Sequence, residues 1–226
     1  MMELLSDSEL EESDVVANCN MNRERNLRGS NGYERDLRFD PLAFLRDVEA
    51  QHDNAKWLDL CCGTGKALIE AAAEVDKESL SIEIIGVDLV GMFDSNESAS
   101  LTLVEASLSL WQPPPQCKFD LITCVHGLHY IGDKLQLIER SLAWLSPIGT
   151  FAANLDRDNL KLENGDDSEL IDGLRHAGFS YSALQKLLRS DGIRNVDFAL
   201  EYLGADPEAG PNYTGQPAVN SWYRKM

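Results

Sequence analysis

The sequence has 226 residues, a net charge of −18 and an apolar fraction of 43%, which suits one globular domain that buries a substantial core without disulfides or metal. A surface this acidic disfavours nucleic acids and anionic membranes as partners. The five cysteines lack the spacing of a disulfide framework, and no apolar run approaches the roughly 18 residues of a membrane span. We therefore expect a cytoplasmic protein with free thiols, monomeric or homodimeric, that binds neither nucleic acid nor membrane.

The N-terminal part divides into two segments. Residues 1 to about 20 are acidic and serine-rich, which predicts a mobile or loosely docked tail. Five of the twelve arginines then fall between residues 23 and 38, a local excess of positive charge in an acidic protein. The stretch FDPLAFLRDVEAQ follows. It predicts a helix, because Asp40 can cap the first turn and Pro41 suits the first helical position.

From Lys56 onward, strand and helix patterns alternate. Strands are predicted in KWLDL, SIEIIGVDL, SLTLVEAS, KFDLITCVH and GTFAANL, and helices in GKALIEAAAEV, DKLQLIERSLAWL and DSELIDGLRHAG. Such alternation implies a parallel sheet with helices on both faces. The last fifty residues predict two more strands, RNVDFALEYLG and PAVNSWYRK, joined by a loop rich in glycine and proline.

The turn LDLCCGTG, between the first strand and its helix, is the strongest sign of a ligand. Glycines there let a ligand approach the backbone, and the helix N-terminus offers free N–H groups. A dinucleotide site would need a third small residue where Leu68 stands, so this pattern fits a dinucleotide poorly. Asp59, four residues before Gly63, suits a ligand with a cationic amino-acid end.

This turn resembles motif I of the class I S-adenosylmethionine-dependent methyltransferases, with Cys61 at the first glycine position. The resemblance implies a Rossmann-like, mostly parallel seven-stranded sheet with helices on both faces and an antiparallel C-terminal strand. The two terminal strands would form the hairpin that closes this sheet. It also implies S-adenosyl-L-methionine as cofactor, S-adenosyl-L-homocysteine as product, and no metal. We expect a methyltransferase domain over residues 41–226, preceded at 1–40 by the acidic tail and an arginine-rich lid.

The same resemblance implies which residues bind the cofactor. Asp88 ends the second strand and would accept both ribose hydroxyls, a role suited to a carboxylate because it accepts two hydrogen bonds. Leu89 would cover the adenine, and Ser107 stands where the family usually has an acid near the adenine amino group. The predicted cofactor-binding residues are Asp59, Cys61, Gly63, Gly65, Asp88, Leu89, Ser107, Leu108 and Val125.

Candidate substrate and catalytic residues lie in three segments near the carboxyl ends of the strands, where ligands of open parallel sheets bind. After the fourth strand, His126 and His129 are candidate general bases, although methyl transfer by in-line displacement can proceed by orientation alone. In the arginine-rich segment, Arg23 and Tyr33 are candidate contacts to a carboxylate, and Tyr33 is also a candidate catalytic residue. In the C-terminal loop, Asn212 and Tyr213 are candidate substrate contacts.

Several functions remain open at this stage. The favoured one is methyl transfer to a small organic molecule, with molecules that carry an acid group among the candidates. The alternatives are a methyltransferase for RNA or protein, a non-catalytic module that binds S-adenosylmethionine or its product, and a nicotinamide-dependent oxidoreductase. The mass of a co-purified ligand would separate the oxidoreductase from the others, and transfer of a labelled methyl group would separate an enzyme from a binding module.

Overall fold

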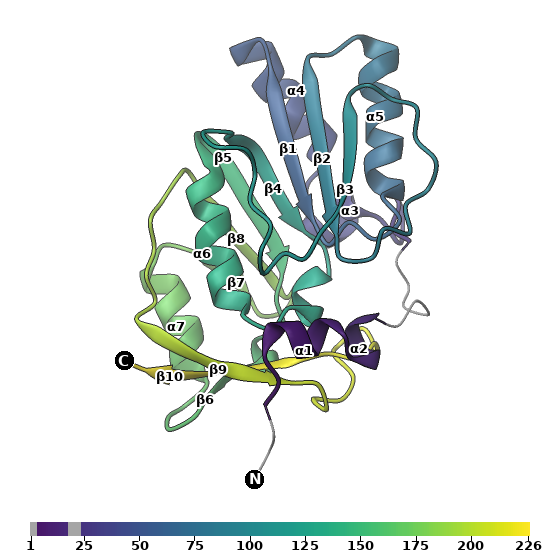
Figure 1. Ribbon diagram of the computed structural model, residues 1–226. Coiled ribbons are helices and arrows are strands. Elements are labelled where there is room, and N and C mark those ends of the chain that lie inside the picture. Colours follow the sequence, from purple (N-terminus) through teal and green to yellow (C-terminus); the bar gives the residue numbers. More distant parts are fainter. Residues whose placement is uncertain (1–3, 18–23) are drawn as a thin grey trace.

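A computed structural model describes residues 4–17 and 24–226. Its centre is a seven-stranded sheet of order β3-β2-β1-β4-β5-β8-β7 (Figure 1). Strands β1 to β5 run parallel, and β8 runs antiparallel to both of its neighbours. The bounds are Ala55–Leu60 (β1), Ile82–Asp88 (β2), Leu101–Glu105 (β3), Phe119–Cys124 (β4), Leu145–Asn154 (β5), Ser180–Ser182 (β7) and Leu187–Asp191 (β8). The predicted fold class is therefore confirmed.

Four longer helices cover the two faces of this sheet. Helices α4 (Pro41–His52) and α5 (Lys66–Glu78) share one core cluster with the sheet, and α6 (Lys134–Trp144) and α7 (Ser168–His176) share the other. Helix α4 begins as expected, because the Asp40 carboxylate accepts hydrogen bonds from the N–H groups of Leu42 and Ala43 at 2.9 and 3.1 Å. The helices predicted from the 3.6-residue period are thus confirmed.

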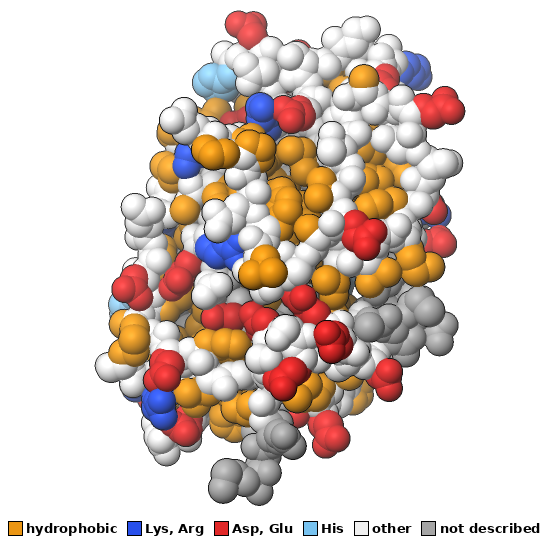
Figure 2. Space-filling view, viewed as in Figure 1, with side chains coloured by type: hydrophobic (Ala, Val, Ile, Leu, Met, Phe, Trp, Pro, Cys, Tyr) orange, Lys and Arg blue, Asp and Glu red, His pale blue; other side chains and the backbone are white. Residues whose placement is uncertain are grey.

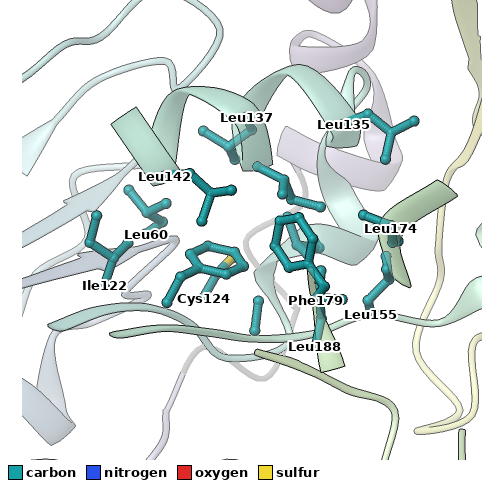
Figure 3. Packing of buried hydrophobic residues seen from close by; sticks show 14 of the residues in the cluster. Leu60, Ile122, Cys124, Leu135, Leu137, Leu142, Leu155, Leu174, Phe179 and Leu188 are labelled. Carbon is teal, nitrogen blue, oxygen red and sulfur yellow. The ribbon is translucent and has the colours of Figure 1, made fainter. Parts of the chain in front are cut away.

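The core cluster under α6 consists of side chains from the strands of the main sheet and from the helices that cover it. Leu137 and Leu142 point from α6 toward Ile122 and Cys124 of β4, and the ring of Phe179 fills the space beside them (Figure 3). Each of these side chains is at most 4% exposed. Apolar side chains on both faces of β4 are buried because helices lie on both sides of it.

The last two strands do not lie where we expected them. Strands β9 (Leu200–Asp206) and β10 (Asn220–Lys225) do pair antiparallel, but they form a separate sheet with β6 (Leu160–Leu162), of order β6-β10-β9. The assignment of the terminal pair to the main sheet was therefore wrong. The antiparallel strand of the main sheet is β8, between β5 and the edge strand β7; it is short and combines two leucines with three polar residues, so its pattern is weak.

The N-terminal segment packs more firmly than its composition suggested. Leu5 exchanges two backbone hydrogen bonds of 2.8 Å with Ala205 of β9. The short helices α1 (Asp7–Glu11) and α2 (Asp14–Ala17) follow, and Leu10 is only 1% exposed. Figure 1 shows both helices beside the loops at the carboxyl ends of the central strands. The described part of the tail is therefore docked.

The arginine-rich segment also contributes to the core. It contains helix α3 (Tyr33–Leu37), and Leu27, Tyr33 and Leu37 are buried in the cluster of α4 and α5. The two remaining helices are single 3₁₀ turns, η1 (Gly127–Tyr130) and η2 (Arg157–Asn159). Within the described residues, no helix is long and apolar enough to cross a membrane.

Candidate functional site

Two cavities meet beyond the carboxyl ends of β1, β2 and β4. The first, with about 690 Å³ of unfilled space that includes open solvent, has mostly apolar walls that include Leu89, Leu108 and Leu137; we call it the leucine cavity. The second, with about 570 Å³, contains His126 and His129; we call it the histidine cavity. Cys61, Asp88 and Tyr130 line both. Because ligands of open parallel sheets bind at this edge, the two cavities together form the candidate site.

The glycine turn lies where the cavities meet, because Cys61 lines both of them and Gly63 lines the histidine cavity. Cys61, Gly63 and Gly65 all have left-handed backbone angles, with φ of 59, 62 and 78°. A side chain at Gly65 would also meet Leu103 at 2.9 Å. Cys61 therefore adopts a conformation that favours glycine, which fits its place at the first glycine position of the motif.

Asp88 lies at the junction of the two cavities and is 5% exposed. Its carboxylate accepts hydrogen bonds from the N–H of Gly63 at 2.9 Å and from the N–H of Val90 at 3.0 Å. These bonds fix the carboxylate beside the glycine turn. An acceptor-only group held between two adjoining cavities suits a ligand with paired hydroxyls.

Asp59 lies beneath the histidine cavity rather than in its wall. The hydroxyls of Tyr33, at 2.7 Å, and Thr123 both donate to its carboxylate, and the Trp57 indole donates to Thr123 at 2.7 Å. Burial raises the pKa of Asp59 to about 7, although the bonds from Thr123 and Tyr33 lower it. Burial and the nearby Asp59 also raise the pKa of Tyr33. Tyr33 lines the histidine cavity and thus separates Asp59 from it.

His126 lines the histidine cavity and has a hydrogen-bonding partner at each ring nitrogen. Its Nε2 is 3.0 Å from Asp36 Oδ2, and its Nδ1 is 3.1 Å from the Tyr213 hydroxyl. Burial acts to raise the pKa of Asp36, but the hydrogen bond and charge of His126 and the charge of Arg25 keep it below its ordinary value. Asp36 is therefore a carboxylate that accepts from Nε2–H. In the neutral ring with its proton on Nε2, Nδ1 is an acceptor.

His129 lies beside His126, and the centroids of their stacked rings are 6.0 Å apart. It is 1% exposed, and burial, with the charges of His126 and Lys134, lowers its pKa to about 3. Asn159 lies close enough to affect this pKa, but neither ring nitrogen of His129 has a hydrogen bond in the described part of the chain. His129 is thus a neutral imidazole with spare hydrogen-bonding capacity in the cavity wall.

The other predicted site residues divide between the cavity walls and the structure behind them. Gly63 and Val125 line the histidine cavity, and Leu89 and Leu108 line the leucine cavity. Asn212 is buried and accepts hydrogen bonds from Thr214. Arg23 lies outside the described residues. Asp59, Gly65, Ser107, Asn212 and Tyr213 are not among the residues that line the two cavities.

Sequence reasoning missed several residues that the structure brings to the site. Arg25 and the loop residues Thr214 and Gln216 line the histidine cavity. Their segments were predicted to reach the site, but nothing in the sequence distinguished these side chains. Glu11 lines the leucine cavity from α1, and no local pattern signals a contact between such distant segments.

The family model of a methyltransferase domain matches residues 32–196. This match covers well over half of the chain, and the chain therefore belongs to the methyltransferase domain family. It confirms the resemblance inferred from motif I. No curated protein matches the chain.

Several solved structures are similar at low identity. The plantazolicin methyltransferase BpumL in complex with SAH is 15% identical, with 52% of this chain and 46% of that one covered and a TM-score of 0.41. A putative methyltransferase from Bacillus halodurans is 16% identical, with 63% and 70% covered and a TM-score of 0.42. A phosphoethanolamine N-methyltransferase from Haemonchus contortus is 16% identical, with 66% and 35% covered and a TM-score of 0.45. This chain spans about half the length of the first structures it matches.

The described residues show no group of three or more His, Cys, Asp or Glu side chains placed to hold a metal ion. The four cysteines in residues 24–226, namely Cys61, Cys62, Cys117 and Cys124, are free thiols. Burial and neighbouring acids raise the pKa of Cys62, which keeps it a thiol beside the glycine turn. The site therefore offers hydrogen bonds, one histidine–aspartate pair and apolar walls.

Proposed function

We propose that the protein transfers a methyl group from S-adenosyl-L-methionine to a small organic acceptor. The observation that carries this proposal is the position of Asp88, fixed beside the glycine turn where the two cavities meet. With its ribose hydroxyls at Asp88, the cofactor would be held with its adenine among the residues of the leucine cavity and its methionine end near Tyr33, and would supply the methyl group on the side of the histidine cavity. Membership of the methyltransferase domain family supports this reading.

The residues present fit such a cofactor. The leucine cavity offers apolar walls for a planar base, and Asp88 offers acceptors for hydroxyl groups. The buried Asp59, with its raised pKa, lies behind Tyr33 near the methionine end. When bound, the cofactor supplies an electrophilic methyl carbon on a positively charged sulfur. The walls of the histidine cavity hold the acceptor in line with that carbon and exclude water.

His126 is the proposed general base. A hydroxyl or amine acceptor that displaced Tyr213 from Nδ1 would give its proton to the imidazole when it takes up the methyl group that the cofactor would supply. The Asp36 carboxylate, 3.0 Å from Nε2, would stabilise the imidazolium that results. Asp36 thus orients the base, and Tyr213 would have to leave Nδ1 before an acceptor could bind there.

An acid group on the acceptor is favoured by Arg25, which lines the histidine cavity, because guanidinium pairs well with carboxylates. The acceptor would lie between the arginine-rich segment and the loops that follow β4 and β9.

RNA is disfavoured by the charge of −18. Figure 2 shows acidic side chains gathered over α1 on the face that it presents. We also propose a cytoplasmic location. The proposed division of the chain is an N-terminal tail and lid segment over residues 1–40 and a methyltransferase domain over residues 41–226.

Calorimetry and methyl transfer test the proposal in sequence. We expect the protein to bind S-adenosylhomocysteine and not NAD. With labelled S-adenosylmethionine, we expect transfer to a metabolite fraction and none to tRNA or to cell protein. Binding of NAD alone would exclude the proposal. Preferential labelling of tRNA or protein would support the proposed cofactor but show that the acceptor is a macromolecule. Binding without transfer to any fraction would favour a non-catalytic module.

A further inference from the structure

One carboxylate in the wall of the leucine cavity comes from the N-terminal segment. Glu11 enters the cavity wall from α1. This residue lies outside the stretch matched by the methyltransferase domain model, which begins at residue 32. The rest of the wall is mostly apolar in area, but Asp7, Asp88, Asp133 and Arg140 also line it. Glu11 is half-buried, and a carboxylate partly removed from water is stabilised by hydrogen-bond donors.

The position of Glu11 is fixed by contacts on both sides. Leu5 pairs with Ala205 through two hydrogen bonds of 2.8 Å, and Tyr202 donates to Asp7 at 3.0 Å. The hydroxyls of Ser107 and Ser109 donate to Glu11 Oε1 at 2.6 and 3.2 Å. These contacts attach α1 to the loop after β3.

Only one carboxylate oxygen of Glu11 is used by these bonds. Oε1 accepts both serine hydroxyls, and Oε2 has no donor among the residues that the structure describes. The one basic side chain in the described wall, Arg140, instead donates to the backbone carbonyls of Leu108 and Ser109 at 2.9 and 3.0 Å. Glu11 therefore presents an acceptor to the leucine cavity that Arg140 does not neutralise.

We propose that Glu11 is a specificity residue for the cofactor, and that Oε2 accepts a hydrogen bond from the exocyclic amino group of the adenine. This inference rests on the proposed function, because ribose hydroxyls at Asp88 are what direct the base into the leucine cavity. An ionised carboxylate can only accept. It therefore favours a base with an amino group at this edge and opposes one with a carbonyl oxygen, which would place two acceptors against each other.

The test compares S-adenosyl-L-homocysteine with S-inosyl-L-homocysteine, in which that amino group is replaced by a carbonyl oxygen. We expect the intact protein to bind the adenosine compound roughly 10- to 100-fold more tightly, the usual consequence of one lost charge-assisted hydrogen bond. In Glu11→Gln the side chain keeps its size, and its amide can donate to a carbonyl oxygen as well as accept. The ratio of the two dissociation constants should then fall to within about threefold.

Glu12→Gln is the matched control, because Glu12 is the exposed neighbour at the end of the same helix; it should keep the wild-type ratio. If Glu11→Gln merely undocked α1, both ligands would weaken together and the ratio would stay as in the wild type. An unchanged ratio in Glu11→Gln, or a wild-type protein that does not discriminate, therefore overturns this inference while leaving the proposed function intact. Failure of the wild-type protein to bind either compound overturns both.

Discussion

The buried carboxyl of Asp59 predicts a specific dependence of stability on pH. Its pKa is about 7 in the folded protein against an ordinary value of 3.8. Between these values the folded state holds a proton that the unfolded chain has released, so this group's stabilising contribution is present below pH 4 and is lost as pH rises through 7. For this shift the loss between pH 5 and pH 8 is about 3 kcal/mol.

Comparison of the wild type with Asp59→Asn isolates this effect. Other carboxyls, among them Asp36 and Asp40, have lowered pKa values and oppose the trend in the wild type. Unfolding by denaturant at pH 5, 6, 7 and 8 should show that the variant gains about 3 kcal/mol relative to the wild type across this range. Asp47→Asn, which removes an exposed carboxyl of α4, is the control. Parallel profiles for wild type and Asp59→Asn would refute the reasoning.

Four further substitutions test the site and its support. Asp88→Ala should weaken binding of S-adenosylhomocysteine by about 1.5–3 kcal/mol in calorimetry and should also lower the melting temperature, because the N–H groups of Gly63 and Val90 lose their acceptor; an unchanged dissociation constant in the folded variant would remove Asp88 from the cofactor site. His126→Gln should lower kcat about 100-fold or more, and Asp36→Asn by a smaller factor, without changing cofactor affinity; full turnover would remove the proposed base. Gly86→Ala should destabilise the fold by about 1–3 kcal/mol in denaturant unfolding, because its methyl group would lie 2.5 Å from Leu68 Cδ1; wild-type stability would show that Leu68 can move.

The central sheet was predictable because each of its strands carries a local signal. The stretches before Asp88 and around Ile122 are almost continuously apolar, as buried parallel strands are. The antiparallel strand β8 has five residues with alternating burial, and such a pattern is common in loops and edges. Strands β9 and β10 were recognised as strands, but their partner could not be, because β6 has three residues. Pairing of such strands depends on tertiary contacts rather than on local propensity.

The cofactor side of the site was more predictable than the acceptor side. The glycine turn and Asp88 have fixed spacing along the chain. In contrast, the bond between Asp36 and His126 joins residues 90 positions apart, and that between Glu11 and Ser107 joins residues 96 positions apart. A single sequence holds no information on such pairs.

The arginine-rich segment is anchored to the body of the protein. Part of its charge binds the body of the protein, because Arg28 pairs with Asp40 and Glu74. Leu27 and Leu37 are each 1% exposed in the core. Removal of residues 1–38 would therefore expose this core, so a test of the tail alone should remove only residues 1–17.

The pairing of Leu5 with Ala205 joins residues 200 positions apart, and it has a consequence for how the protein is made. During synthesis, the N-terminal segment emerges first but has no partner until β9 has left the ribosome. Contacts of such long sequence separation form slowly, because the chain entropy is lost before the contact is gained. Until then, Leu5 and Leu10 are exposed to chaperones and to other chains. A bulky fusion partner placed before Leu5 would act at this same step, so a C-terminal tag is the better choice for producing the protein.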